Sequence, residues 1–139
     1  MAAPTAGDLY VDLPWVSIRW DGAHRCVHTE WKGFANSVEF RAALMSALDA
    51  IKARRAIAYL SDTRKVKVVI HTDQAWANEV WVPLAVNAGL KRFALVTAAS
   101  GLGKATVEDV IDMVDNRGLL MRGFDTVAGA QAWLDSGPR

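Results

Sequence analysis

Two short, mainly apolar runs, residues 56–60 and 92–96, each follow a stretch in which apolar residues recur at helical spacing. A third pairing of helix and apolar run closes the chain at residues 124–134. Apolar runs without polar alternation are typical of strands that are covered on both faces, as in a parallel sheet. This alternation of helical and strand-like segments over 139 residues predicts one α/β domain, in which helices cross over between parallel strands.

The beginning of the chain has a different pattern. Apolar and polar residues alternate from Val16 to Trp20, which indicates a strand, and residues 24–31 form a second extended run. Asp21 and Gly22 separate the two runs and favour a tight reversal. We therefore expect an antiparallel N-terminal hairpin followed by parallel strands, in a mixed sheet of about five strands.

About four helices should accompany this sheet. Asn36 can cap the first helix, and Glu39 lies three residues later in capping-box register. Pro83 should kink or split the second helix, predicted at residues 74–88, and Gly89 should end it. The remaining helices are expected at residues 106–117 and 126–134, the remaining strands at 56–60, 93–96 and 119–121, and a loop at 61–72.

The composition limits the classes of protein to which this chain could belong. The 16 basic and 15 acidic residues nearly balance, so nucleic acid and anionic membranes are not expected partners. No apolar run is long enough to be an integral membrane segment. Residues 1–8 lack the features of a secretory signal, and the single cysteine, Cys26, excludes an internal disulfide. We expect a cytoplasmic protein with one domain over residues 1–139, in which residues 1–7 are loose.

The segment from Ser100 to Lys104 lies between a predicted strand and a predicted helix, where a phosphate-binding loop would lie. The full motif needs a glycine where Ala98 stands and a serine or threonine where Ala105 stands. A turn before a helix explains the segment better, and we expect no nucleotide and no other cofactor.

Three potential metal ligands, His24, Cys26 and His28, alternate in the second extended run and would share one face of a strand. The rise of a strand then separates the two histidines by about 13 Å, which is too far for both to bind one zinc ion. We therefore interpret them as polar residues of a strand face and predict no metal site.

Catalytic residues are also not predicted. The chain has no Gly-x-Ser-x-Gly nucleophile elbow, and Ser61, Asp62 and His71 are scattered candidates of the kind that any chain contains. The acidic residues Asp109, Asp112 and Asp115 are expected on a solvated helix face. We expect a protein that is not an enzyme.

Topology indicates where a binding surface would form. Ligands of open parallel sheets gather at the carboxyl ends of the strands. Ser61, Asp62, Thr63 and Arg64 follow one strand, and residues 97–100, with Thr97 and Ser100 at their ends, follow the next. Trp76, near the start of the second helix, would roof this edge. In a second interpretation, Asp62 and Thr63 satisfy loop amides and Trp76 packs inward.

Several short segments resemble the STAS superfamily, and in particular its SpoIIAA-like single-domain proteins. The resemblance covers residues 15–134. The matching segments are Trp31-Lys32-Gly33, residues 59–64, residues 73–76, residues 83–85 with 89–94, and residues 124–126 leading to 132–134.

The resemblance implies a noncatalytic regulatory module. Some members of the superfamily bind a kinase-like partner and are switched by phosphorylation of a serine or threonine after the third strand, which here would be Ser61 or Thr63. The glycine of that family motif is missing after Arg64. Other proteins with this fold bind lipids or small apolar ligands.

Our main hypothesis is therefore a binding module that recognises a protein partner or a small ligand at the predicted strand ends. The alternative is a small hydrophobic-ligand or lipid carrier, which the six tryptophans and the 52% of hydrophobic residues would suit. Exposed apolar surface on the leading hairpin or on a helix would support a homodimer.

Overall fold

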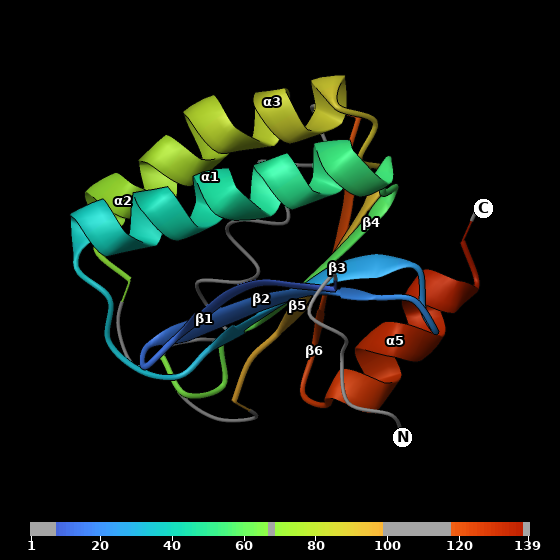
Figure 1. The fold of residues 1–139 in the computed structure, drawn as a ribbon, viewed down its shortest axis with the longest axis horizontal. Helices are drawn as coiled ribbons and strands as arrows, with labels where there is room; N and C mark the ends of the chain where they lie inside the picture. Colours follow the sequence, from blue (N-terminus) through green and yellow to red (C-terminus); the bar gives the residue numbers. More distant parts are fainter. Residues whose placement is uncertain (1–7, 67–68, 99–117, 138–139) are drawn as a thin grey trace.

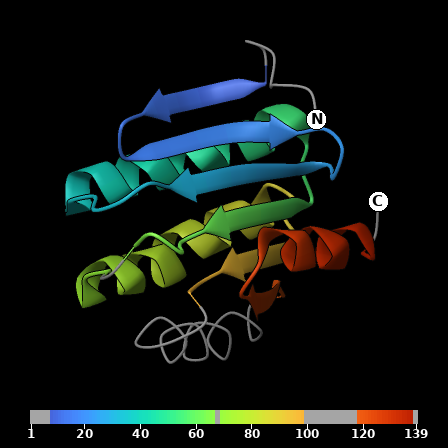
Figure 2. The same cartoon turned by 90° about the horizontal axis from the view of Figure 1, so that it is seen from below.

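A computed structural model describes residues 8–66, 69–98 and 118–137. Its centre is a six-stranded mixed sheet in which the spatial order of the strands equals their order in the sequence (Figures 1 and 2). The first three strands are antiparallel, and the last three run parallel to the third. The strands are β1 (Leu9–Leu13), β2 (Val16–Asp21), β3 (Cys26–Trp31), β4 (Ala58–Asp62), β5 (Arg92–Val96) and β6 (Leu120–Phe124).

The α/β class, the antiparallel hairpin and the parallel strands that follow it are confirmed. The sheet has six strands where about five were expected, because β1 adds an edge strand before the hairpin. Most side chains of β1 are exposed on both faces, including those of Leu9 and Leu13. A strand without a buried face leaves no alternating pattern in the sequence, so only its pairing with β2 identifies it.

Helix α1 (Ser37–Arg54) begins as predicted. The Asn36 side chain accepts a hydrogen bond from the Glu39 amide, and the Glu39 carboxylate accepts one from the Asn36 amide, which completes a capping box. The helix ends at Arg55, whose backbone is left-handed with φ of 51°. Six residues of α1 are buried, and they form the stripe that packs against the sheet: Ala43, Leu44, Ala47, Leu48, Ala50 and Ile51.

The second helical segment is divided as the position of Pro83 predicts. It consists of α2 (His71–Trp76), a π-helical turn η1 (Ala77–Trp81) and α3 (Val82–Asn87). Pro83 carries no N–H for the preceding turn, and the helix widens into η1 directly before α3. The segment begins three residues earlier than predicted, and Gly89, with φ of 108°, follows its end.

Helix α5 (Val127–Asp135) begins at its predicted cap, since Thr126 Oγ1 accepts a hydrogen bond from the Gly129 amide. The described residues therefore contain three helical segments. The helix predicted at residues 106–117 lies outside the described residues, so the expected number of four is not tested. In the described ranges, no helix combines the length and the apolar character that crossing a bilayer requires.

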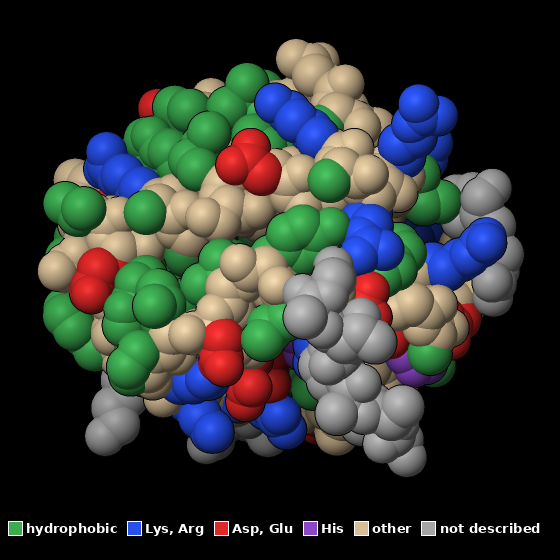
Figure 3. Space-filling model, in the orientation of Figure 1, with side chains coloured by type: hydrophobic (Ala, Val, Ile, Leu, Met, Phe, Trp, Pro, Cys, Tyr) green, Lys and Arg blue, Asp and Glu red, His purple; other side chains and the backbone are tan. Residues whose placement is uncertain are grey.

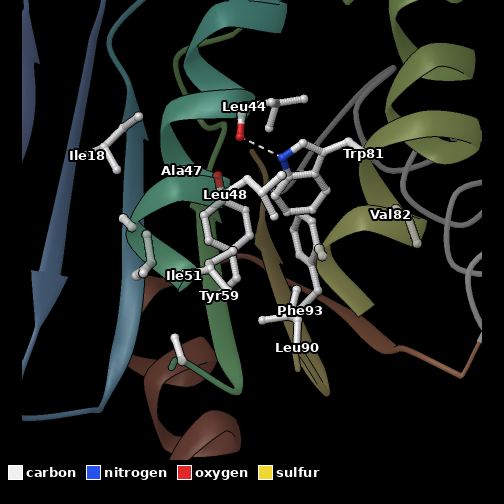
Figure 4. Packing of buried hydrophobic residues seen from close by; sticks show 14 of the residues in the cluster. Ile18, Leu44, Ala47, Leu48, Ile51, Tyr59, Trp81, Val82, Leu90 and Phe93 are labelled. Carbon is white, nitrogen blue, oxygen red and sulfur yellow. Dashed lines mark hydrogen bonds between the residues drawn. The ribbon is translucent and has the colours of Figure 1, made fainter. Parts of the chain in front are cut away.

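The helices form two layers around the sheet. Helices α1, α2 and α3 cover one face, and α5 covers part of the other (Figures 1 and 2). Under α1 and α3, the rings of Tyr59, Trp81 and Phe93 contact one another with centroids 4.9–5.9 Å apart (Figure 4). Trp81 Nε1 donates a hydrogen bond of 2.6 Å to the carbonyl of Leu44, which ties η1 to α1.

The face under α5 is built from smaller side chains. Ala58, Leu60, Ala94 and Val96 of β4 and β5 pack against Ala130 and Leu134 of α5. This helix lies mainly over β4, β5 and β6, and Gln131 also donates a hydrogen bond to Asp21 at the end of β2. The same face of β2 and β3, beside the carboxyl end of β4, carries polar and charged side chains, and these form the site described below.

Candidate functional site: a charged strand end

The carboxyl ends of the parallel strands lie at one edge of the sheet, as the topology predicts. Beyond β4, both the amide and the Oγ1 of Thr63 donate hydrogen bonds to the carbonyl of Val96, at 2.7 and 2.8 Å. Beyond β5, the amide of Thr97 donates to the carbonyl of Phe124. Backbone hydrogen bonds thus fix Thr63 and Thr97 side by side. The hydroxyl of Thr63 already donates its proton to the Val96 carbonyl, so it cannot donate to a ligand.

Ser61 belongs to β4 and not to the loop predicted from residue 61 onward, because the strand continues through Asp62. Strand alternation directs the Ser61 side chain to the face covered by α1, where its Oγ accepts a hydrogen bond of 3.0 Å from Trp31 Nε1. Ser61 is only 4% exposed. A kinase or a partner would reach this hydroxyl only after β4 opens locally.

Asp62 points to the opposite face and forms the strongest polar contact of this edge. Arg64 donates from Nε to Asp62 Oδ1 at 2.9 Å and from Nη2 to Oδ2 at 2.8 Å, and the Arg64 amide also donates to Oδ1. The Asp62 side chain is 6% exposed, whereas that of Arg64 is 46% exposed. Burial opposes ionisation of Asp62, but the hydrogen bonds and charge of Arg64 outweigh it and lower the pKa of the carboxyl.

His28 lies on the same face, one strand away. It pairs across the strands with Arg19, whose Nη2 lies 3.1 Å from His28 Nδ1. A guanidinium only donates, so Nδ1 accepts and the imidazole proton resides on Nε2. Burial, followed by the positive charge of Arg19, lowers the pKa of His28 to about 4. The ring is therefore neutral at pH 7 and adds no charge to this face.

Glu30 and Lys65 complete the group. Glu30 is the cross-strand neighbour of Asp62, and Lys65 Nζ lies 3.8 Å from the Glu30 carboxylate. We call the six residues Arg19, His28, Glu30, Asp62, Arg64 and Lys65 the charged strand-end cluster. In the space-filling view, acidic and basic side chains gather along the lower side of the molecule, while hydrophobic side chains are prominent over the helical layer (Figure 3).

The described contacts of Trp76 are with α1 and the hydrophobic core, and not with the charged strand-end cluster. The guanidinium of Arg41 on α1 lies over its ring at 5.3 Å from the centroid, and the half-buried indole packs against the core. Arg41 and Ser37 both bind the buried carboxylate of Asp73, which joins α2 to the start of α1. This placement agrees with the interpretation in which Trp76 packs inward. Ser100 lies outside the described residues.

Cys26 and His28 share one face of β3, as predicted, but His24 does not. His24 lies in the turn before β3, and its Nδ1 is 2.9 Å from the carboxylate of Asp135 on α5. Cys26 is buried beneath α5, where burial raises the pKa of the thiol. Within residues 8–66, 69–98 and 118–137, no three side chains of metal-binding type form a cluster.

Sequence reasoning named Asp62 and Arg64, and it interpreted His28 as a polar residue of a strand face, but it missed Arg19 and Glu30. The alternation of β2 and β3 contained a usable signal, because Arg19, His28 and Glu30 all point away from the apolar face. Only the register between β3 and β4 shows that Asp62 joins them.

Comparison of the chain with protein-family models, with curated proteins and with solved structures finds no match. The resemblance to the STAS superfamily therefore stays a prediction, and the functional argument depends on the geometry of the charged strand-end cluster.

Proposed function

We propose that this chain is a noncatalytic, STAS-like regulatory module that recognises an acidic segment of a protein partner at the charged strand-end cluster. The observation that carries the proposal is the pairing of Asp62 with Arg64. The buried carboxylate holds the guanidinium in one orientation while nearly half of the Arg64 side chain faces solvent. A pre-oriented arginine loses less side-chain entropy when it binds an anionic group.

The arrangement leaves binding capacity on Arg64. Asp62 uses Nε and one hydrogen of Nη2, so the Nη1 group and the second Nη2 hydrogen remain for a partner. Around it, the cations Arg19, Arg64 and Lys65 outnumber the carboxylates Glu30 and Asp62, and His28 is neutral at pH 7. A surface with this charge favours an acidic partner and speeds its association.

Affinity capture from the native cell, followed by mass spectrometry, tests the proposal. The tagged chain and its Arg64→Gln variant are compared with Lys52→Gln, which removes an exposed positive charge from the far end of α1. We expect the native chain and Lys52→Gln to retain the same acidic protein, and Arg64→Gln to lose it. Equal recovery by all three proteins would show that the charged strand-end cluster is not the recognition site.

The alternative, a lipid or hydrophobic-ligand carrier, is discriminated by the same experiment when small molecules are also analysed. A lipid between the helices and the sheet would have to displace Tyr59, Trp81 and Phe93, whose rings occupy that space (Figure 4). A stoichiometric lipid that co-purifies with both the native chain and Arg64→Gln would support the carrier and contradict the binding module.

A further inference from the structure

A pocket of about 280 Å³ lies at the other end of the sheet, where β4 begins. Three separate parts of the chain meet there. The turn between β2 and β3 contributes His24 and Arg25, the end of α1 contributes Arg55, and α5 contributes Leu134. The pocket therefore lies at the opposite end of β4 from the charged strand-end cluster, and the two sites share no residue.

Two arginines of this pocket have an unusual backbone. Arg25 and Arg55 have φ angles of 53° and 51°, and they are the only non-glycine residues with positive φ in the described part of the chain. Residues other than glycine, asparagine and aspartate rarely adopt this conformation, and glycine is the usual residue after a helix end such as that of α1. Strained residues cluster at functional sites, and here both strained residues are arginines that line one pocket.

Only some of the charged side chains around the pocket have a partner of opposite charge. His24 is paired with Asp135, and Arg54 is paired with Asp8 and with the hydroxyl of Tyr10. Neither Arg25 nor Arg55 forms an ion pair with any residue of the described ranges. Both side chains are exposed, so their charges are directed to the solvent at the mouth of the pocket.

Apolar atoms make up most of the pocket wall, which also includes the carboxylate of Asp135, paired with His24. The apolar atoms include those of Ile57 and Leu134, together with the ring of Trp20, which the guanidinium of Arg54 covers at 5.5 Å. Pockets that combine apolar walls with a few convergent polar groups are typical of sites for small organic ligands, whose volumes start at about 300 Å³. A pocket just under that size admits only a compact ligand.

We propose that this pocket binds a compact organic anion, with Arg25 and Arg55 contacting the anionic group and the apolar wall contacting the body of the ligand. The shared chemistry is that of a carboxylate or a phosphate monoester. This inference is independent of the function proposed for the charged strand-end cluster, since loss of one site leaves the residues of the other in place.

Nuclear magnetic resonance of the full-length protein tests the proposal with three probes of similar shape: phenyl phosphate, benzoate and the neutral benzamide. We expect the two anions to shift the amide signals of Arg25 and Arg55 and the indole signal of Trp20, with a Kd of about 1 mM. Benzamide should leave these signals unchanged. The relative affinities of phenyl phosphate and benzoate distinguish a phosphate site from a carboxylate site.

Three arginine variants and one control variant separate binding from a structural role. Arg25→Gly and Arg55→Gly should each weaken binding of phenyl phosphate by about fivefold. Each should also raise Tm by about 3 °C, because glycine relieves the left-handed backbone. Arg55→Asn, which also tolerates the left-handed backbone, should lose affinity with a smaller gain in Tm than Arg55→Gly. Lys32→Gln, at the far end of β3, removes an exposed charge and should leave binding unchanged.

The proposal is overturned by any of three results. The first is that neither anion shifts the pocket signals at about 10 mM, a concentration well above the expected Kd. The second is that benzamide shifts them as much as benzoate does. The third is that the glycine and asparagine variants bind phenyl phosphate as tightly as the native chain.

Discussion

The two faces of the sheet differ in what they bury. The face under α1 and α3 is filled by large aromatic side chains, among them Tyr59, Trp81 and Phe93. The face under α5 is built mainly from alanine, leucine and valine, and it gives way to the charged strand-end cluster beside the end of β4. Since aromatic side chains bury the most apolar area, the first face supplies most of the stability. The stability of the first face therefore offsets the desolvation cost of the buried polar groups on the second.

The largest effect expected from this contrast is that of Trp81→Ala. Trp81 is 1% exposed and is held by Tyr59, Phe93 and its hydrogen bond to Leu44, so its loss should lower the free energy of unfolding by about 4 kcal/mol. Trp133→Ala, on the other face, removes a half-buried indole and should cost about 1.5 kcal/mol. Urea denaturation measures both, and equal losses would contradict the asymmetry of the two faces.

The second effect depends on pH and reports on the charged face. The pKa of His28 is about 4 in the folded chain and near its ordinary 6.5 when unfolded, so the unfolded state binds a proton first as pH falls. The contribution of His28 to the free energy of unfolding is fully present above pH 6.5. It is lost progressively as the pH falls toward 4, and the total loss is at most about 3 kcal/mol.

The His28→Gln variant isolates this effect, because glutamine can still accept the hydrogen bond from Arg19 and does not titrate. We expect the native chain to lose more stability than His28→Gln between pH 7 and pH 4, in denaturant titrations at each pH. Parallel curves for the two proteins would show that His28 is not held neutral by the fold.

A smaller effect should follow from Asp62→Asn. The change removes the charge that orients Arg64, and we expect a loss of about 1.5 kcal/mol, limited by the exposure of the guanidinium. Asp12→Asn is the matched control, because Asp12 forms an exposed pair with Lys32 that should contribute almost nothing. Chemical denaturation compares the two. A cost of Asp62→Asn no larger than that of Asp12→Asn would mean that burial gives the Asp62 pair no advantage.

The smallest effects concern the helices that cover the two faces. Asn36→Ala removes one side of the capping box of α1 and should cost about 1 kcal/mol. Thr126→Ala removes the single cap bond of α5 and should cost about 0.5 kcal/mol. Thermal unfolding of both variants gives the ranking, and a larger loss for Thr126→Ala would show that α5 contributes more to stability than its side chains suggest.

The sequence predicted the elements whose signals are local. The capping residues Asn36 and Thr126, the split at Pro83 and the stop at Gly89 are each encoded within a few neighbouring residues. The edge at which Asp62 and Thr97 meet also followed from the sequence, because right-handed crossovers align the ends of parallel strands. The exposed strand β1 was missed, since it has no buried face to leave a pattern.

The sequence by itself therefore determined the order of the described elements from β2 onward, the direction of the central strands and the edge that carries Asp62 and Arg64. Only the tertiary structure decided that Arg19, His28 and Asp62 lie on one face of three neighbouring strands, and that Arg25 and Arg55 line one pocket. The physical reason is that periodicity reports whether a side chain is buried, whereas its neighbours across strands depend on register. Register is set by the packing of the whole core, which no local pattern contains.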